Sequence, residues 1–439
     1  MSRALFGTDG VRGLAGQYPL DDAGVEAIGR AVGTQLAQPG EQIVVGCDTR
    51  ESSEHLVAML TQGLQGVDVE VVFVGVIPTP GLAYITAQHD EFVAGVMITA
   101  SHNPYEFNGV KVFSASGSKL PDDAEERLNH DIEAGVPDRA SPGDTESKAT
   151  PKNTALLTKQ YEDFLVASAG GLNLRGYRIA VDTAHGAASG LGQRVFERLG
   201  ATVVPLGNEP DGRNINVRCG ATDTAELQRV VRVNDCDCGV AVDGDADRLI
   251  MVDALGRECN GDYLLYLLAV ANGYSHVVAT VMSNLGTEHA LQARGVTMER
   301  TAVGDRYVLE RLLATGHKLG GEQSGHIILP ELATTGDGLL AAVQVLHAVT
   351  ASGKTLGEWR DDVTMLPQAL VNFVIQDKTK LNAPEVTAYI QTKTAELGSA
   401  GRVLVRPSGT EPLARVMVEA PSAETLATEM AQHIERLVS

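Results

Sequence analysis

A pattern of apolar runs that occurs three times constrains the fold of this 439-residue chain more than any other feature. In each copy, an apolar run rich in Val and Ile is followed by a loop, by a stretch with helical spacing of its apolar residues, and by a second apolar run. The copies occupy residues 42–75, 177–207 and 276–304. This order predicts a strand, a helix and a second strand in each copy. Because the copies begin about 100 to 135 residues apart, well beyond the period of a solenoid, we expect three related α/β domains.

The remainder of the chain predicts one linker and one further domain. A polar stretch with Pro and Ser, residues 135–153, separates the first copy from the second. From about Leu366 onward, an apolar run, a helical stretch, two apolar runs and a second helical stretch predict an α+β domain. The predicted fold is α/β, with three related α/β domains with mixed sheets plus a smaller C-terminal α+β domain around a central cleft. The predicted domains are residues 1–150, 151–253, 254–365 and 366–439.

The charge of the chain limits its partners. The sequence contains 56 acidic and 35 basic residues, for a net charge of −21, and only 4% of its residues are aromatic. This composition disfavours non-specific binding to nucleic acid or to an anionic membrane, and it disfavours base stacking. An anionic small-molecule substrate must therefore meet a local cluster of basic residues.

The five cysteines are an odd set without the spacing of a disulfide framework or a zinc site, which is typical of a reducing compartment. The N-terminus carries no signal-like apolar segment, and no apolar run is long enough to span a membrane. We expect a cytoplasmic protein.

The stretch GVMITASHNPYEFNGVKVF, residues 95–113, places a candidate nucleophile after a buried strand. Pro104 disfavours a helical conformation at the preceding residue, so Ser101 and His102 are expected on an irregular loop. Ligands of open α/β sheets collect beyond the carboxyl ends of strands. The alternative is a turn whose side chains bond to their own backbone. Adjacent residues of an extended chain also point to opposite sides, so His102 need not face Ser101.

Three carboxylates in VAVDGDADRLIMVD predict a cation site. Asp243, Asp245 and Asp247 alternate between two apolar runs, and Gly244 permits a tight bend. Crowded carboxylates repel one another, and a hard cation such as Mg²⁺ would relieve this repulsion. An EF-hand is excluded, because its position six is Arg248 instead of glycine. A solvated acidic turn remains the alternative, and Arg248 adds a positive fork beside the site.

The stretch RPSGTEPLARVMVE predicts an anion site. Arg406 and Arg415 flank Ser408, Gly409 and Thr410, so guanidinium, hydroxyl and backbone N–H groups can surround one phosphate. The alternative is a glycine turn between strands, with both arginines facing solvent.

Weaker signals are carried by GGEQSGH and AVGDRYV. Glu322, Ser324 and His326 alternate and would share one face of an extended segment, where they suit the hydroxyls or amine of a sugar. Gly304 and Asp305 are a weaker candidate pair. A structural histidine is the alternative for His326.

Two basic residues complete the candidate set. Arg12 lies among glycines in FGTDGVRG, and Lys111 follows Ser101 at a distance that a loop and a strand can fold back. Either residue can also be an ordinary surface charge.

Five motifs together, FGTDGVRG, TASHNPYEFNGVKVF, DGDADR, GEQSGH and RPSGTEPLARVMVE, resemble the α-D-phosphohexomutase superfamily and, within it, the bacterial phosphoglucosamine mutases. The resemblance extends from Phe6 to about Glu419. It departs from the family pattern at Ala246, where a glycine is frequent. All three carboxylates are preserved in spite of this change.

The resemblance implies an isomerase that interconverts glucosamine 6-phosphate and glucosamine 1-phosphate, in the route to UDP-N-acetylglucosamine. A phosphoryl group on Ser101 would pass to the sugar phosphate, and glucosamine 1,6-bisphosphate would be the intermediate. One Mg²⁺ ion would be held by Ser101, Asp243, Asp245 and Asp247. A kinase or a bisphosphate would prime Ser101, and the protein could form a homodimer.

The same resemblance implies roles for the other candidates. Catalytic roles beside the transferring phosphate fall to His102, Lys111, Arg12 and Arg248, with Lys111 favoured over His102 as the base. Substrate-binding roles fall to Gly304, Asp305, Glu322, Ser324, His326, Arg406, Ser408, Gly409, Thr410 and Arg415. The alternatives are phosphomannomutase or phosphoglucomutase activity, a sugar-phosphate phosphatase, and a non-catalytic binder.

Overall fold

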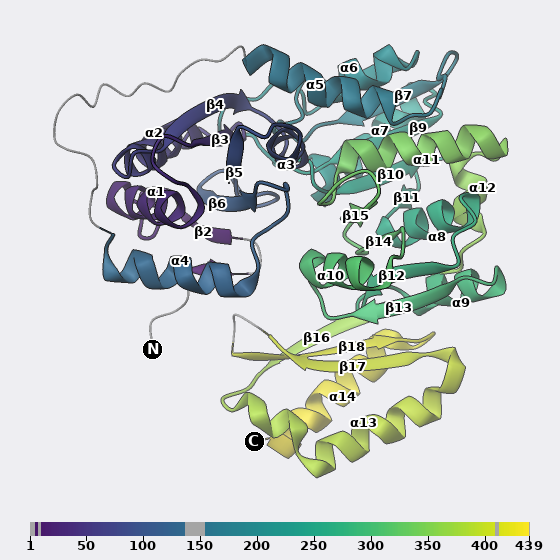
Figure 1. Ribbon diagram of the computed structural model, residues 1–439. Coiled ribbons are helices and arrows are strands. Elements are labelled where there is room, and N and C mark those ends of the chain that lie inside the picture. The colour runs from purple at the N-terminus through teal and green to yellow at the C-terminus, as the bar shows by residue number, and fades with distance from the viewer. Residues whose placement is uncertain (1–4, 8–9, 137–153, 409–411, 439) are drawn as a thin grey trace. The chain divides into compact units, whose positions relative to one another are not determined.

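The computed structural model describes residues 5–7, 10–136, 154–408 and 412–438, and these form two compact units (Figure 1). The larger unit comprises Met1–Val281 and Met298–Arg360, and the smaller comprises Met282–Thr297 and Asp361–Ser439. Each unit is built from helices packed on sheets, as the apolar pattern predicts.

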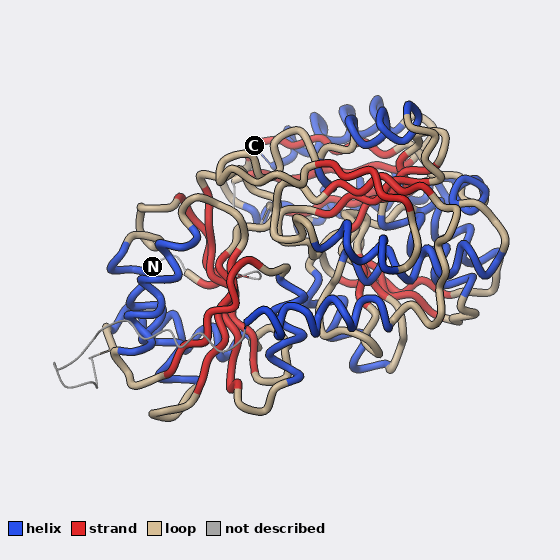
Figure 2. Tube along the Cα trace, turned by 90° about the horizontal axis from the view of Figure 1, so that it is seen from above, coloured by secondary structure: helices blue, strands red, loops and turns tan. Residues whose placement is uncertain are grey.

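The first sheet of the larger unit has six strands in the order β1-β2-β6-β5-β3-β4. It is mixed: β3 is parallel to β4 and β5, whereas β6 is antiparallel to β5 and β2. Figure 2 shows this sheet nearly edge-on with helices on both faces. One apolar cluster packs α1, α2 and α4 against the sheet, and a second cluster packs α3 and α5 against it. The strands are β1 Phe6–Gly7, β2 Gly10–Leu14, β3 Gln42–Cys47, β4 Glu70–Val76, β5 Phe92–Ile98 and β6 Phe107–Ser114. The helices are α1 Asp22–Leu36, α2 Ser53–Gln65, α3 Thr79–Gln88, α4 Asp122–Ala134 and α5 Thr154–Ala167.

The second sheet has the order β11-β10-β9-β7-β8 and is also mixed. β7 is parallel to β8 and β9, and β9 and β10 form an antiparallel hairpin whose connection carries the three aspartates. The strands are β7 Arg178–Asp182, β8 Thr202–Leu206, β9 Cys238–Val242, β10 Leu249–Asp253 and β11 Glu258–Cys259. The helices are α6 Leu191–Arg198 and α7 Ala225–Val233, with a 3₁₀ turn at Gly220–Thr222.

The third sheet has the order β13-β12-β14-β15, with β14 and β15 as a short hairpin. The strands are β12 His276–Thr280, β13 Thr297–Thr301, β14 Gly320–Gly321 and β15 Ile327–Ile328. The helices are α8 Gly261–Ala271, α10 Asp305–Thr315, α11 Gly338–Ser352 and α12 Leu356–Asp361. Ten of the fifteen residues of α11 are buried, and the polar Gln344 and His347 are only partly buried. The apolar surface of α11 is therefore wide, as expected of a helix packed on several sides.

The smaller unit contains a three-stranded antiparallel sheet, β16-β18-β17, whose core is shared with two long helices. Its elements are β16 Gln368–Val374, α13 Pro384–Leu397, β17 Arg402–Pro407, β18 Leu413–Glu419 and α14 Ala423–Val438, together with α9 Leu285–Ala293 and 3₁₀ turns at Lys378–Asn382 and Gly398–Ala400. The predicted fold class, three α/β domains with mixed sheets and a smaller α+β domain, is confirmed.

Within the described ranges, no helix combines the length and the apolar character needed to cross a bilayer. All five cysteines are buried and free, so they act as packing residues.

Candidate active site

Ser101 lies on the loop that follows β5, where the sequence places it, and its backbone is left-handed, with φ of 52°. Several groups hold this conformation. The Ser101 amide donates to Thr99 Oγ1 at 2.9 Å, and the Ser101 carbonyl accepts hydrogen bonds from Arg50 Nη2 at 2.8 Å and Asn216 Nδ2 at 2.9 Å. The Arg50 guanidinium is itself fixed by a fully buried ion pair with Asp48, at 2.8 Å. Backbone strain of this kind, held by several side chains, is frequent at functional sites.

Sequence reasoning did not identify Arg50 or Asn216. Arg50 follows the carboxyl end of β3, the strand next to β5, and that position is the only local signal for it. It also donates to the carbonyls of Asn103, Pro104 and Phe107, so one guanidinium organises the whole loop.

The Ser101 hydroxyl donates a 2.7 Å hydrogen bond to Asp243 Oδ2. His102 Nδ1 lies 3.3 Å from the same hydroxyl. His102 thus faces Ser101, because the positive φ of Ser101 replaces the extended geometry in which adjacent side chains point to opposite sides.

The three aspartates converge as expected. Asp243 and Asp245 are fully buried and Asp247 is nearly so, and one oxygen from each lies within 4.8 Å of the others. Burial, followed by the charges of Asp247 and Asp245, raises the pKa of Asp243 to about 8. Asp247 differs: although burial raises its pKa, the charges of Lys111 and His326 hold that pKa well below the ordinary value.

This donor set fits a hard cation. Within the described residues, Asp245 Oδ1 and Asp247 Oδ1 are buried oxygens without a hydrogen-bond partner. Their other oxygens accept from Lys111 Nζ, at 2.8 Å for Asp245 and 3.3 Å for Asp247. Thr79 Oγ1 donates to Asp245 at 2.6 Å, a contact that sequence reasoning missed. Three buried carboxylates with oxygens within 4.8 Å of one another, one of them bonded to the Ser101 hydroxyl, match the preference of Mg²⁺ for oxygen ligands.

Basic groups surround the Ser101 loop. Arg12 Nη1 donates to Asn103 Oδ1 at 3.2 Å, and Arg248 Nε lies 3.9 Å from Asp247. Burial and then the charges of Arg248 and Arg12 lower the pKa of His102 to about 4. The structure therefore brings all five predicted catalytic residues to one place.

The sugar-binding candidates meet the same site through His326. Its Nε2 lies 3.3 Å from Asp305 Oδ2 and its Nδ1 lies 3.7 Å from Asp247 Oδ1. These two carboxylates raise the pKa of His326 to about 9 against the opposing effect of burial. Asp305 also accepts a 2.7 Å hydrogen bond from Lys119 Nζ, which sequence reasoning missed.

Residues 322–326 form a tight turn between β14 and β15, so the predicted extended segment is wrong. Gly325 has φ of +94°, and a Cβ there would lie 2.0 Å from the Leu249 carbonyl oxygen. Glu322 accepts from the Gly304 amide at 3.1 Å, whereas Ser324 is exposed. The turn thus brings Glu322 and Gly304 together, and it leaves Ser324 exposed while His326 is buried.

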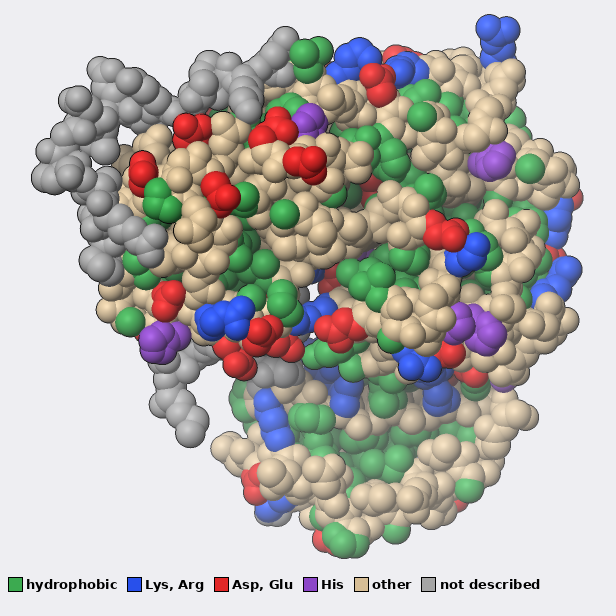
Figure 3. Space-filling view, viewed as in Figure 1, with side chains coloured by type: hydrophobic (Ala, Val, Ile, Leu, Met, Phe, Trp, Pro, Cys, Tyr) green, Lys and Arg blue, Asp and Glu red, His purple; other side chains and the backbone are tan. Residues whose placement is uncertain are grey.

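The smaller unit holds the predicted anion-binding residues. Arg406 and Arg415 are directly opposite each other on β17 and β18, and Arg415 Nη2 lies 3.4 Å from the buried Ser408 hydroxyl. Burial and the charge of Arg415 lower the pKa of Arg406. Lys378 Nζ, not identified from sequence, donates to the Ser408 carbonyl at 2.5 Å. Figure 3 shows several basic side chains over these strands on the viewed face. Gly409 and Thr410 lie outside the described residues.

Comparisons with known proteins cover nearly the whole chain. Sequence models of the phosphoglucomutase/phosphomannomutase family match as α/β/α domain I at residues 3–137, domain II at 159–256, domain III at 260–365 and the C-terminal domain at 370–436. The phosphoglucosamine mutase of Thermus thermophilus is 45% identical over 439 residues, which is 99% of this chain and 98% of that protein. The phosphoglucosamine mutase of Methylibium petroleiphilum is 44% identical over 99% of this chain and 98% of that protein.

Solved structures support the fold. A phosphoglucomutase/phosphomannomutase family protein from Burkholderia thailandensis superposes with a TM-score of 0.80 at 24% identity, covering 100% of this chain and 97% of that one. The Aspergillus fumigatus N-acetylphosphoglucosamine mutase, in complex with GlcNAc-6P and magnesium, has a TM-score of 0.69 at 19% identity, covering 99% and 96%. The four matched domains and the full-length relatives together show that the chain belongs to the phosphoglucosamine mutase family of the α-D-phosphohexomutase superfamily.

Proposed function

We propose that this isomerase interconverts glucosamine 6-phosphate and glucosamine 1-phosphate, with Ser101 as the carrier of the phosphoryl group. The observation that carries the proposal is the 2.7 Å hydrogen bond between the Ser101 hydroxyl and Asp243, inside a group of buried carboxylates. A serine hydroxyl beside such carboxylates is suited to phosphoryl transfer, which depends mainly on positioning and charge neutralisation.

Ser101 first donates its phosphoryl group to the sugar phosphate and then takes a phosphoryl group back. The bond between phosphorus and Ser101 Oγ breaks as a hydroxyl of the sugar phosphate forms a new bond to phosphorus, which gives glucosamine 1,6-bisphosphate. The other phosphate of this intermediate then returns to Ser101. The attacking hydroxyl loses its proton to a neighbouring base. Lys111, favoured for this role on sequence grounds, would first have to release Asp245 and Asp247, so we assign charge neutralisation to its ammonium group.

We assign cation binding to Asp243, Asp245, Asp247 and the phosphorylated Ser101. A bound Mg²⁺ would supply positive charge against the oxygens of the transferring phosphate. The buried oxygens of Asp245 and Asp247 that lack a hydrogen-bond partner support this assignment. The magnesium in the Aspergillus fumigatus enzyme supports it by analogy.

Substrate contacts are proposed for two groups of residues. The turn at residues 322–326 and the start of α10 would contact the sugar, and the β17–β18 region would bind the phosphate that is not reacting. The first group is Gly304, Asp305, Glu322, Ser324 and His326. The second is Arg406, Ser408, Gly409, Thr410 and Arg415. We place the domain boundaries near residues 150, 253 and 365, and we expect Ser101 to be primed by a kinase or a bisphosphate in the cytoplasm.

The test is intact-mass analysis with peptide mapping, followed by turnover of glucosamine 6-phosphate. We expect one phosphate on Ser101, no mutase activity in Ser101→Ala, and full activity in Ser116→Ala, which changes an exposed serine of the same domain. Mutase activity retained by Ser101→Ala would disprove the carrier role. Release of inorganic phosphate at the rate of substrate loss would indicate a phosphatase, and faster turnover of glucose or mannose phosphates would indicate a hexose mutase.

A further inference from the structure

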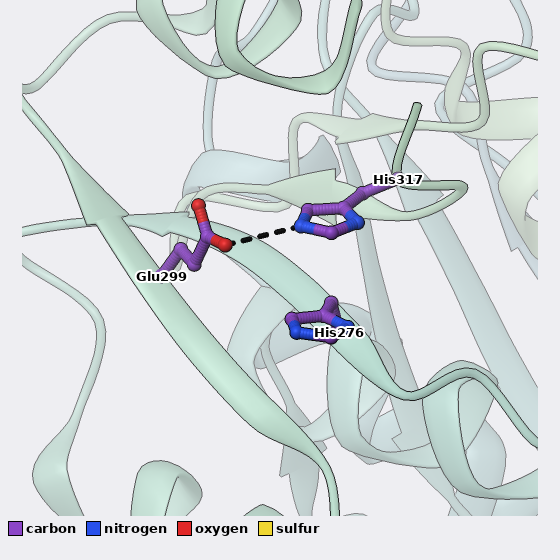
Figure 4. A group of neighbouring side chains, drawn as sticks. All are labelled: His276, Glu299 and His317. Atoms are coloured by element: carbon purple, nitrogen blue, oxygen red, sulfur yellow. Dashed lines mark hydrogen bonds and ion pairs between the residues drawn. The ribbon is translucent and has the colours of Figure 1, made fainter. Parts of the chain in front are cut away.

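Two histidines and a glutamate converge in the third domain, outside the proposed active site. His276 begins β12, Glu299 lies in β13, and His317 follows the C-terminal end of α10. All three side chains are partly buried, and one potential ligand atom from each lies within 4.8 Å of the others (Figure 4). No step of the proposed mutase reaction uses these residues.

The carboxylate of this cluster is oriented toward the imidazoles. Glu299 Oε2 accepts a 2.7 Å hydrogen bond from Arg311 Nε, and Glu299 Oε1 lies 3.0 Å from His317 Nε2. Arg311 therefore fixes one oxygen and leaves the other facing the rings, as Figure 4 shows for Glu299 and His317. This geometry presents Glu299 as a ligand with a single coordinating oxygen.

His276 has a partner that suits a ligand histidine. Its Nδ1 lies 2.9 Å from the Ser275 hydroxyl. In the tautomer in which Nδ1–H donates to Ser275, Nε2 carries the lone pair. Metal-binding histidines almost always donate their other ring N–H to such an outer partner, which fixes the tautomer.

The C-terminal ends of two helices provide an electrostatic field that favours a cation beside the cluster. A cavity beside the cluster is lined by both histidines and by Asn272 and Gly316, the residues that cap the C-terminal ends of α8 and α10. Lys318 also lines the cavity, and its ammonium group is paired with Glu331 at 3.0 Å. The C-terminal end of a helix carries partial negative charge and attracts cations. Two such ends and the Glu299 carboxylate therefore favour a positive ion next to the imidazoles.

The two rings are stacked, with centroids 4.3 Å apart and planes 7° from parallel. A metal ion lies in the plane of each imidazole that binds it, so one ring must tilt when an ion enters. Both rings line the cavity, so we expect the rotation of one of them to accompany metal binding.

We propose that His276, Glu299 and His317 bind one transition-metal ion, with Zn²⁺ as the best match. Two imidazole nitrogens, one carboxylate oxygen and a water molecule satisfy the tetrahedral preference of Zn²⁺. Mg²⁺ prefers oxygen ligands in octahedral geometry and should not compete. An ion here would tie together the start of β12, strand β13 and the segment that enters β14, and would thus stabilise the third domain.

The experiment is a calorimetric titration of the metal-stripped, full-length protein with ZnCl₂ in the presence of excess Mg²⁺, which occupies the aspartate loop. We expect one Zn²⁺ per chain in the wild type and in Asp243→Asn. We expect no measurable binding in His276→Ala and His317→Ala, and binding about 10- to 100-fold weaker in Ser275→Ala, which removes only the outer partner. The control His130→Ala changes an exposed histidine that also lies beside a carboxylate, Asp131, and should bind Zn²⁺ as the wild type does.

Visible absorption of the Co²⁺-substituted wild type provides a second measurement that requires no variant, and it should show the intense bands of a tetrahedral site. The proposal is overturned if the wild type binds no Zn²⁺ under excess Mg²⁺, or if folded His317→Ala binds it with unchanged affinity. Loss of the site in Asp243→Asn would also overturn it, because the ion would then belong to the aspartate loop.

Discussion

The Ser101 hydroxyl donates a 2.7 Å hydrogen bond to Asp243, although 142 residues separate the two in sequence. The contact joins the loop after β5 to the loop after β9, and therefore joins the carboxyl ends of strands in two different sheets. A second contact also joins these two domains: the Thr79 amide donates a hydrogen bond to the Asp245 carbonyl at 3.0 Å. The phosphoryl transfer that we propose at Ser101 thus depends on how closely two domains of the larger unit approach.

Gly244 sets that approach, and its replacement by alanine should reduce turnover. An added Cβ would lie 2.6 Å from the Ser101 carbonyl oxygen and 2.7 Å from Asn216 Nδ2. These contacts would push the two loops apart, and a displacement of about 1 Å can cost about 10²-fold in rate. We expect Gly244→Ala to lower kcat by about that factor in a steady-state assay. The control is Ala246→Gly on the same loop, where φ of 60° already suits glycine. Equal activity of Gly244→Ala and the wild type would contradict the prediction.

We expect Lys119 to position Asp305. Its ammonium donates at 2.7 Å to the same carboxylate oxygen that faces His326 at 3.3 Å. Hydrogen bonds to charged groups contribute about 1.5–3 kcal/mol, so Lys119→Met should lower kcat/KM by about 10- to 100-fold. Lys119→Arg should restore part of this loss. Lys159→Met, which breaks an exposed helical ion pair, is the control and should leave kcat/KM unchanged. If Lys119→Met has the kcat/KM of the wild type, Lys119 does not position Asp305 for catalysis.

The sequence predicted the positions of candidate functional residues correctly where they directly follow an apolar run. Ser101 and the three aspartates could be placed at strand ends because burial of the run fixes where the loop begins. Arg50 and Asn216 could not be found this way, because they act on backbone carbonyls of a distant loop, and no local pattern marks such a partner. The class of the fold followed from periodicity, but contacts between domains did not.

Residues 322–326 were misjudged for a different reason. Alternating polar residues indicate an extended chain only when the backbone is free to extend. Here the positive φ of Gly325 and its close approach to Leu249 impose a turn instead. A glycine between two polar residues was the available signal, and it was outweighed by the alternation.

Replacing Arg406 should weaken substrate binding without lowering the stability of the protein. Like charges directly opposite each other on adjacent strands are destabilising, and the lowered pKa of Arg406 reflects both its burial and the charge of Arg415. We expect Arg406→Gln to leave the unfolding midpoint unchanged or slightly raised while KM for the phosphosugar rises several-fold. Arg402→Gln on the same strand is the matched control. It loses an ion pair with Glu419 at 3.0 Å, so its unfolding midpoint should fall without a change in KM. A lower midpoint and an unchanged KM in Arg406→Gln would argue against anion binding.

Asp337 should make stability depend on pH. It is buried at the N-terminus of α11, where Oδ1 accepts from the Leu340 amide at 2.9 Å and Oδ2 accepts from the Tyr161 hydroxyl at 2.8 Å. Burial outweighs these hydrogen bonds and raises the pKa of Asp337 to about 6. The folded state thus holds the proton more tightly than the unfolded state. The stabilisation from this group is fully present below the unfolded pKa of about 3.9 and is lost as pH rises through about 6.

The difference between the folded and unfolded pKa of Asp337 corresponds to about 3 kcal/mol at most. Asp337→Asn keeps a residue that caps helices well but removes the titration. Urea unfolding at pH 4.5, 5.5 and 7.5 should therefore show the variant gaining stability relative to the wild type as pH rises, with the difference levelling above pH 7. In Tyr161→Phe, loss of a hydrogen bond that lowers the pKa of Asp337 should move the wild-type transition to higher pH. Parallel stability curves for the wild type and Asp337→Asn would mean that the Asp337 carboxyl titrates in the folded protein as it does in the unfolded chain.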